Sequence, residues 1–200
     1  MKKYYILSLI IFMFTGICAA VSSPDRLSLG NAPSIVYKEI FDYLEKKDYS
    51  KLTNSLSQQV CLACDEIEAR YKFNIKEDIA QKLKQSDYEG LRISMVKLVY
   101  FDTKNILFSI DAKNTDDIAM LNDWLKSAYS NYVILSPDIQ AKNMVVDWKL
   151  RKMFIMLFSK LSSSGYTEKK VDLNADTKTA VKDITSKIDS ALSEAFPEFN

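Results

Sequence analysis

The chain has 200 residues, of which 48% are hydrophobic, 26% charged and 12% aromatic, which is a globular rather than a disordered composition. Histidine is absent, which excludes histidine-based triads, histidine general bases and histidine-ligated haem or zinc. The spacing of the four glycines excludes a phosphate-binding loop, a dinucleotide fingerprint and a nucleophile elbow.

The first twenty residues predict an export signal. Lys2 and Lys3 precede an apolar run over 4–20, and the small residues Cys18 and Ala20 suit the positions before a cleavage site. We expect cleavage after Ala20 and a periplasmic or extracellular protein. Two alternatives stay open: an uncleaved anchor, which would be the chain's only contact with the membrane, or a lipid on Cys18.

The charge of the mature chain is nearly balanced. Without Lys2 and Lys3 the chain has 25 basic and 26 acidic residues, and the few arginines are far apart in the sequence. A protein that binds phosphate backbones needs a concentrated positive footprint. We therefore exclude nucleic acid as a partner.

Helical periodicity begins at Ser34, after a stretch over 21–33 whose Ser, Pro, Gly and Asn predict a flexible tether. From there apolar residues recur every three or four positions, which predicts one helical domain over 34–200. A short helix is expected over 76–85. The apolar stripes consist of Val36, Ile40, Tyr43 and Leu44; Leu52, Leu56, Val60, Ala63, Ile67 and Tyr71; Ile118, Leu121, Leu125, Ala128, Tyr132 and Leu135; Val146, Leu150, Phe154, Leu157 and Leu161; and Val181, Ile184, Ile188, Leu192 and Phe196.

Polar and special residues predict where these helices begin and end. Asn114 is an expected N-cap. Ser136 and Pro137 suit the N-cap and first turn of a new helix. Gly165 suits a C-terminal stop. These boundaries give about six or seven helices.

The segment over 88–112 is ambiguous. Residues 92–101 and 106–112 could form a hairpin, which would make the fold α+β, but the intervening Asp102-Thr103-Lys104-Asn105 contains no glycine for a tight turn. A helix would be apolar on several faces, as is typical of a central buried helix. We favour the helix and an all-α bundle.

An internal similarity spans this part of the chain at a constant offset of 39 residues. An acid-Ile, Leu, Asp-Tyr, Leu, Ser pattern occurs twice, with Asp48-Tyr49 matched by Asp87-Tyr88. The pattern predicts a duplicated helical hairpin, in which Asp caps the second helix and Tyr packs across the turn. Chance agreement between two amphipathic segments is the alternative.

Cys61 and Cys64 form the sharpest chemical motif, because their spacing occurs in redox and metal-binding pairs. They lie within a predicted helix, where four ligands cannot surround an ion. We expect a structural pair that can form a disulfide outside the cytoplasm, with Cys61 facing outward and Cys64 at the edge of the buried stripe.

A second candidate site resembles EF-hand-like and dockerin-type calcium loops. Asp172, Asn174, Asp176 and Asp183 occupy positions 1, 3, 5 and 12 of such a loop, but Thr177 replaces the glycine at position 6. The resemblance implies calcium as the only cofactor to consider. A polar loop in which Asn174 or Asp176 caps the last helix explains the same residues.

Two further features are interpreted as structural. Met144, Met153 and Met156, near Trp148, could bind a soft metal but are expected to fill the core. Asp102, on an apolar face, is expected at an exposed helix flank rather than as a functional carboxylate.

The sequence therefore predicts an exported, non-enzymatic interaction or scaffold module of the cell envelope, whose partner is another envelope protein. The alternative is a small exported redox or metal-handling protein that uses Cys61 and Cys64.

Overall fold

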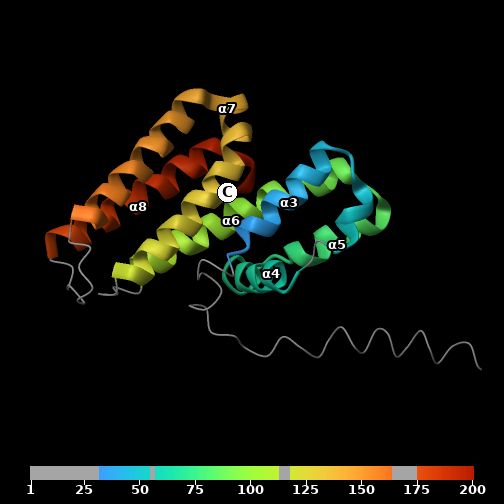
Figure 1. Ribbon diagram of the computed structural model, residues 1–200, viewed down its shortest axis with the longest axis horizontal. Coiled ribbons are helices and arrows are strands. Elements are labelled where there is room, and N and C mark those ends of the chain that lie inside the picture. Colours follow the sequence, from blue (N-terminus) through green and yellow to red (C-terminus); the bar gives the residue numbers. More distant parts are fainter. Residues whose placement is uncertain (1–31, 55–56, 113–117, 164–174) are drawn as a thin grey trace, which may run out of the picture.

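The computed structural model describes residues 32–54, 57–112, 118–163 and 175–200, and these are almost entirely helical (Figure 1). The described residues contain no strand, which confirms the predicted all-α bundle. The α-helices and two 3₁₀ helices, in chain order, are α3 (Ser34–Glu45), η1 (Tyr49–Asn54), α4 (Gln58–Tyr71), α5 (Ile75–Gln85), α6 (Tyr88–Ala112), α7 (Ile118–Ser163), α8 (Ala175–Ala195) and η2 (Pro197–Phe199).

Helix α6 is the centre of the fold. It is one continuous helix, so the alternative α+β fold with a hairpin over 92–112 is wrong. Helices α3, α4 and α5 pack on one part of it, and α7 and α8 on another (Figure 1). Its apolar residues are buried on several faces, as the sequence predicted for a central helix.

Two turns of the first half have the same backbone geometry. Lys47 and Ser86 each adopt φ 55°, which reverses the chain after α3 and α5. In each turn this residue and the following aspartate, Asp48 or Asp87, donate their N–H groups to the last carbonyls of the preceding helix. The tyrosines that follow, Tyr49 and Tyr88, stack face to face with ring centroids 3.7 Å apart.

The chain after the first turn differs from the prediction. The expected stripe from Leu52 to Tyr71 implied one helix, but the structure has η1 and then α4. The break follows from Ser57, whose hydroxyl accepts the N–H of Val60 and caps a new helix. Leu52 is nevertheless buried, as the stripe predicted.

Helix α7 bends at Asn143, not at Ser136 and Pro137 as predicted. Pro137 lies inside the helix, on an exposed side where water can bind the carbonyl that loses its partner. Asn143 has non-helical angles (φ −157°, ψ 95°), and its side-chain oxygen accepts the N–H groups of Val145 and Val146. Residues 144–163 are called the second half of α7 below.

Buried Asp147 holds this bend together. Its carboxylate accepts hydrogen bonds from the hydroxyls of Tyr132 and Ser136, both at 2.7 Å, and from the amide of Gln140 at 3.0 Å. Ser136 therefore binds across the bend instead of capping a helix. Burial, together with the hydrogen bond to Asp147, raises the pKa of Tyr132 to about 12.

Helix α8 closes the bundle against α6 and α7. Its predicted stripe is buried, including Ile188 and Leu192, and the chain then turns so that Phe196 packs edge-on against Tyr100 of α6. Near the bend in α7, Lys142 pairs with Glu198. The C-terminal residues thus tie α8 to both of its neighbours.

Several predicted features lie outside the described residues. These are the signal segment over 1–20, most of the tether over 21–33, the caps Asn114 and Gly165, and part of the calcium loop. Among the helices described, not one combines the length and hydropathy that a bilayer crossing requires.

Candidate functional site

The cysteine pair lies in α4, against the centre of the bundle. Cys64 is only 1% exposed and Cys61 is half-buried. The prediction that Cys64 lies at the edge of the stripe is therefore wrong, since the helix turns that side toward α6. The structure has both residues as thiols, so the predicted disulfide stays a prediction.

The surroundings of Cys64 suppress thiolate chemistry. Burial raises the pKa of its thiol to about 12, and the nearby Cys61 and Asp102 act in the same direction. A thiol attacks disulfides and binds metals as the thiolate. At neutral pH Cys64 therefore stays protonated, which disfavours its use in redox exchange.

The candidate calcium loop is only partly described. Asp172 and Asn174 lie outside the described residues, while Asp176 is in the first turn of α8. Asp183 lies two turns further on and pairs with Lys187 at 2.6 Å. In the described part of the chain no three cysteine, aspartate or glutamate side chains gather closely enough to hold a metal ion. Calcium binding at these residues stays a prediction.

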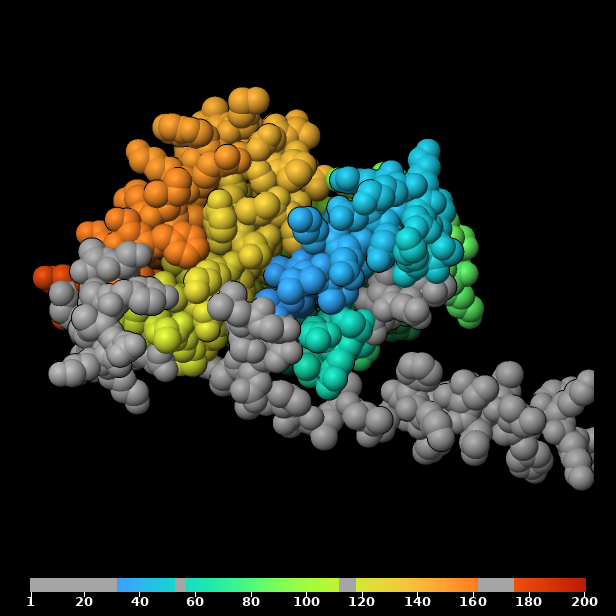
Figure 2. Space-filling model, viewed as in Figure 1, coloured from blue at the N-terminus to red at the C-terminus, as the bar shows by residue number. Residues whose placement is uncertain are grey.

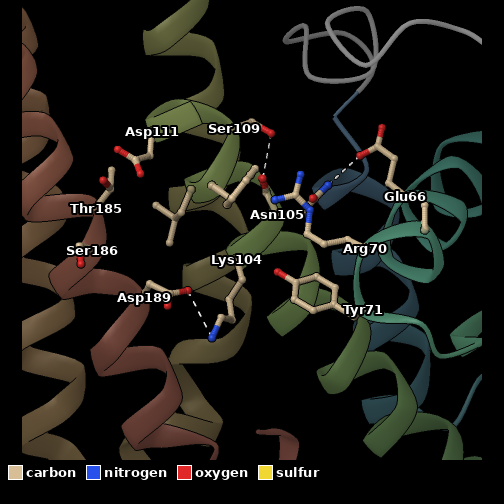
Figure 3. Close-up of a pocket in the computed structure, with 13 residues that line it drawn as sticks. Glu66, Arg70, Tyr71, Lys104, Asn105, Ser109, Asp111, Thr185, Ser186 and Asp189 are labelled. Carbon is tan, nitrogen blue, oxygen red and sulfur yellow. Dashed lines mark hydrogen bonds and ion pairs between the residues drawn. The ribbon is translucent and has the colours of Figure 1, made fainter. Parts of the chain in front are cut away.

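A cleft of about 750 Å³ opens between α4, α6 and α8 (Figure 3). Arg70 and Tyr71 reach into it from α4, Lys104 and Phe108 from α6, and Asp189 from α8. These residues are far apart in the sequence and belong to no motif. Sequence analysis could not bring them together, because only the packing of three helices does so.

The charged groups of this cleft already make contacts within the protein. Lys104 forms an ion pair with Asp189 at 3.3 Å, and Glu66 accepts a hydrogen bond from Asn105 at 2.8 Å (Figure 3). The guanidinium of Arg70 lies 3.7 Å from the centre of the Phe108 ring. A charged ligand would have to displace these contacts. The cleft therefore has room for a small molecule, but Lys104 is already paired with an acid and Arg70 is stacked on Phe108.

Asp102 is fully buried, so its predicted position at an exposed flank is wrong. Its carboxylate accepts hydrogen bonds from Asn131 of α7 at 2.9 Å and from Tyr37 of α3 at 3.3 Å. The contacts join three helices deep in the bundle. Their geometry is that of a polar clamp that fixes how α3, α6 and α7 pack.

The second half of α7 carries five large exposed apolar side chains. Met144 is 71% exposed, Trp148 66% and Ile155 60%. Val145 and Met156 lie beside them, and we call these five residues the α7 face. The segment forms the outer edge of the molecule, in orange in Figure 2. The expectation that Met144 and Met156 fill the core is wrong, whereas Met153 is half-buried.

A basic hollow borders the α7 face on the side of α8. It has a volume of about 370 Å³, and Lys149 and Lys152 of α7 and Lys187 of α8 line it, together with Glu194. Lys152 also lies over the Trp148 ring, 5.8 Å from its centre. The hollow and the α7 face are therefore adjacent on α7, with Lys152 next to both.

No family model matches this chain, and neither do curated proteins or solved structures.

Proposed function

We propose that this protein is an exported, non-enzymatic interaction module of the cell envelope, and that it docks through the α7 face. The exposure of five large apolar side chains within residues 144–156 is the observation that supports the proposal. Contiguous exposed apolar surface is unfavourable in water and marks interaction sites on folded proteins.

The other candidate sites support the same role. In the cleft Lys104 is paired with Asp189, and Arg70 lies over the ring of Phe108, so both cations already have partners. Cys64 is buried, and its raised pKa keeps the thiol protonated. The α7 face differs from both, because its side chains point away from the protein and have no use in packing.

Export is part of the proposal and rests on the sequence of residues 1–20. The intact mass of the protein from its native host should lack these twenty residues. A mass that includes them would mean an anchor, and added acyl chains on Cys18 would mean a lipoprotein.

We also propose that the first half of the chain arose from a duplicated helical hairpin. Support comes from the two turns, where Lys47 and Ser86, 39 residues apart, share the same φ and the same backbone hydrogen bonds. The short η1 that follows the first turn, where the second turn leads into long α6, would be a later divergence.

Oxidative footprinting tests the docking surface without knowledge of the partner. Met144, Trp148 and Met156 are exposed and oxidise readily, so hydroxyl radicals should modify them in the purified protein. In intact envelopes of the native host we expect slower oxidation of these three residues. Phe108, exposed in the cleft, is the control and should react equally in both. Equal rates at the α7 face in both preparations would overturn the proposal.

A further inference from the structure

The exposed charged side chains on the second half of α7 are all basic. Lys149, Arg151, Lys152 and Lys160 are exposed on the second half of α7. The only acidic residue of this half is Asp147, whose carboxylate is buried in the bend and lies 3.5 Å from the guanidinium of Arg151, so this pair adds no net charge and the lysines carry the excess. The chain as a whole is nearly neutral, so this cationic segment is a local feature. Its partner should therefore be anionic and should also accept apolar side chains.

We propose that the α7 face binds an anionic membrane surface, with the second half of α7 lying in the plane of the lipid headgroups. This inference rests on the proposed docking function and names its partner. Interfacial helices have this composition, with lysine and arginine beside tryptophan and aliphatic residues. Tryptophan suits this depth because its ring is apolar and its N–H can reach water or headgroups.

The kind and size of the surface favour a membrane over an acidic protein. Three of the four cations are lysines, which are depleted in protein–protein interfaces, where arginine is enriched. The apolar residues cover residues 144–156, roughly 18 Å of helix. A stable protein interface uses about 20–30 residues on each side. The α7 face is much smaller, and it lies on the outward side of a helix rather than in a groove.

The basic hollow gives the headgroups a place to bind. Lys149 and Lys152 can bind a lipid phosphate while Trp148 and Ile155 enter the acyl boundary. The hollow also contains Glu194, and Asp183 pairs with Lys187. Lys149 and Lys152 therefore supply most of the attraction.

Vesicle co-sedimentation tests the inference with the chain from Val21 onward, which contains every described helix. The vesicles contain phosphatidylethanolamine with phosphatidylglycerol, or phosphatidylcholine alone. We expect binding to the anionic vesicles, weakening as salt rises, and little binding to the zwitterionic ones.

Two double variants assign the binding to its residues. K149E/K152E should lower the partition coefficient by about tenfold or more, since each lysine near an anionic surface contributes appreciably. W148S/I155S should lower it at every salt concentration, because the apolar area that enters the membrane is lost and this contribution does not depend on charge. The matched controls are K38E/K84E for charge and I93S for exposed apolar area, and both should bind as the parent does. Circular dichroism verifies that each variant is folded.

The outcomes separate this inference from the proposed function. Absence of binding to anionic vesicles overturns the membrane inference, and so does binding that neither double variant weakens. If the α7 face is still protected in envelopes, the occupant is a protein and the docking function stands. If protection is also absent, both proposals fail.

Discussion

Helix α6 and the second half of α7 have similar apolar content and opposite surroundings. In α6, residues such as Leu98 and Val99 are buried because five other α-helices surround it. In the second half of α7, one side packs through Val146, Leu150 and Phe154, while the opposite side presents Trp148 and Ile155 to solvent. An apolar side chain on a helix is thus more stable when buried, but the surface that buries it can belong to the same protein or to a binding partner.

The largest expected difference between the two regions is in stability. Leu98→Ala should reduce the free energy of unfolding by about 2–5 kcal/mol, because it opens a cavity in the packed centre of α6. Urea denaturation followed by circular dichroism measures this loss. A loss of under about 1 kcal/mol would contradict the central packing of α6.

Loss of the hydrogen bonds at the bend in α7 should have the second largest effect on stability. Asp147→Ala leaves the Ser136 hydroxyl without its acceptor and the Tyr132 hydroxyl with only the backbone carbonyl of residue 147, which should cost about 1–3 kcal/mol in the same measurement. Asp147→Asn keeps an acceptor oxygen and should cost less. Equal effects of the two variants would mean that the negative charge, rather than the hydrogen bonding, holds the bend.

Alkaline pH should lower the free energy of unfolding through the buried thiol of Cys64. The pKa of Cys64 is about 12 in the folded protein against an ordinary value of 9.0. Between these values the unfolded chain has lost the proton that the folded chain keeps, so stability falls as pH rises. One such group contributes up to about 1.4 kcal/mol per pH unit.

The midpoint of urea unfolding, followed from pH 8 upward, measures this pH dependence. At pH 8, below the pKa of the unfolded chain, the contribution of Cys64 to stability is still complete. Cys64→Ala should flatten the profile without removing it, because the pKa of Tyr71 is also raised to about 12 by burial. An identical slope in the variant would refute the assignment to Cys64.

The smallest effect is expected on the α7 face. Ile155→Ser should change the free energy of unfolding by no more than about 0.5 kcal/mol, since the side chain contacts water in the isolated protein. Thermal melting beside the parent protein is sufficient to detect a difference. A loss comparable with that of Leu98→Ala would show that Ile155 belongs to the core.

Periodicity predicted most of the fold. The stripes of α3, α8 and both halves of α7 are buried or half-buried as expected, and the absence of turn residues identified α6 as a helix. Breaks were harder to place, because Asn143 and Ser57 begin helices through side-chain hydrogen bonds to the backbone that most asparagines and serines inside a stripe do not make. Pro137 is the more conspicuous residue, yet the helix continues through it.

The candidate surface could have been found from the sequence. The predicted stripe from Val146 to Leu161 already defines the buried side of its helix, and Met144, Trp148 and Ile155 fall on the opposite side. Interpreting methionine as core filler ignored this geometry. The cleft between α4, α6 and α8 had no comparable signal, because the spacing of its residues arises only from tertiary packing.

The inward turn of Asp147 also affects how the molecule approaches a charged surface. A protein with almost no net charge experiences little overall attraction, but an uneven charge distribution exerts a torque that rotates it during diffusion. Because Asp147 points inward and pairs with Arg151, it leaves Lys149 and Lys152 unopposed by another acid of this half of α7, and these lysines lead that rotation. The bend thus sets an electric dipole as well as a shape, and the encounter rate with an anionic surface should fall once the screening length drops well below about 10 Å.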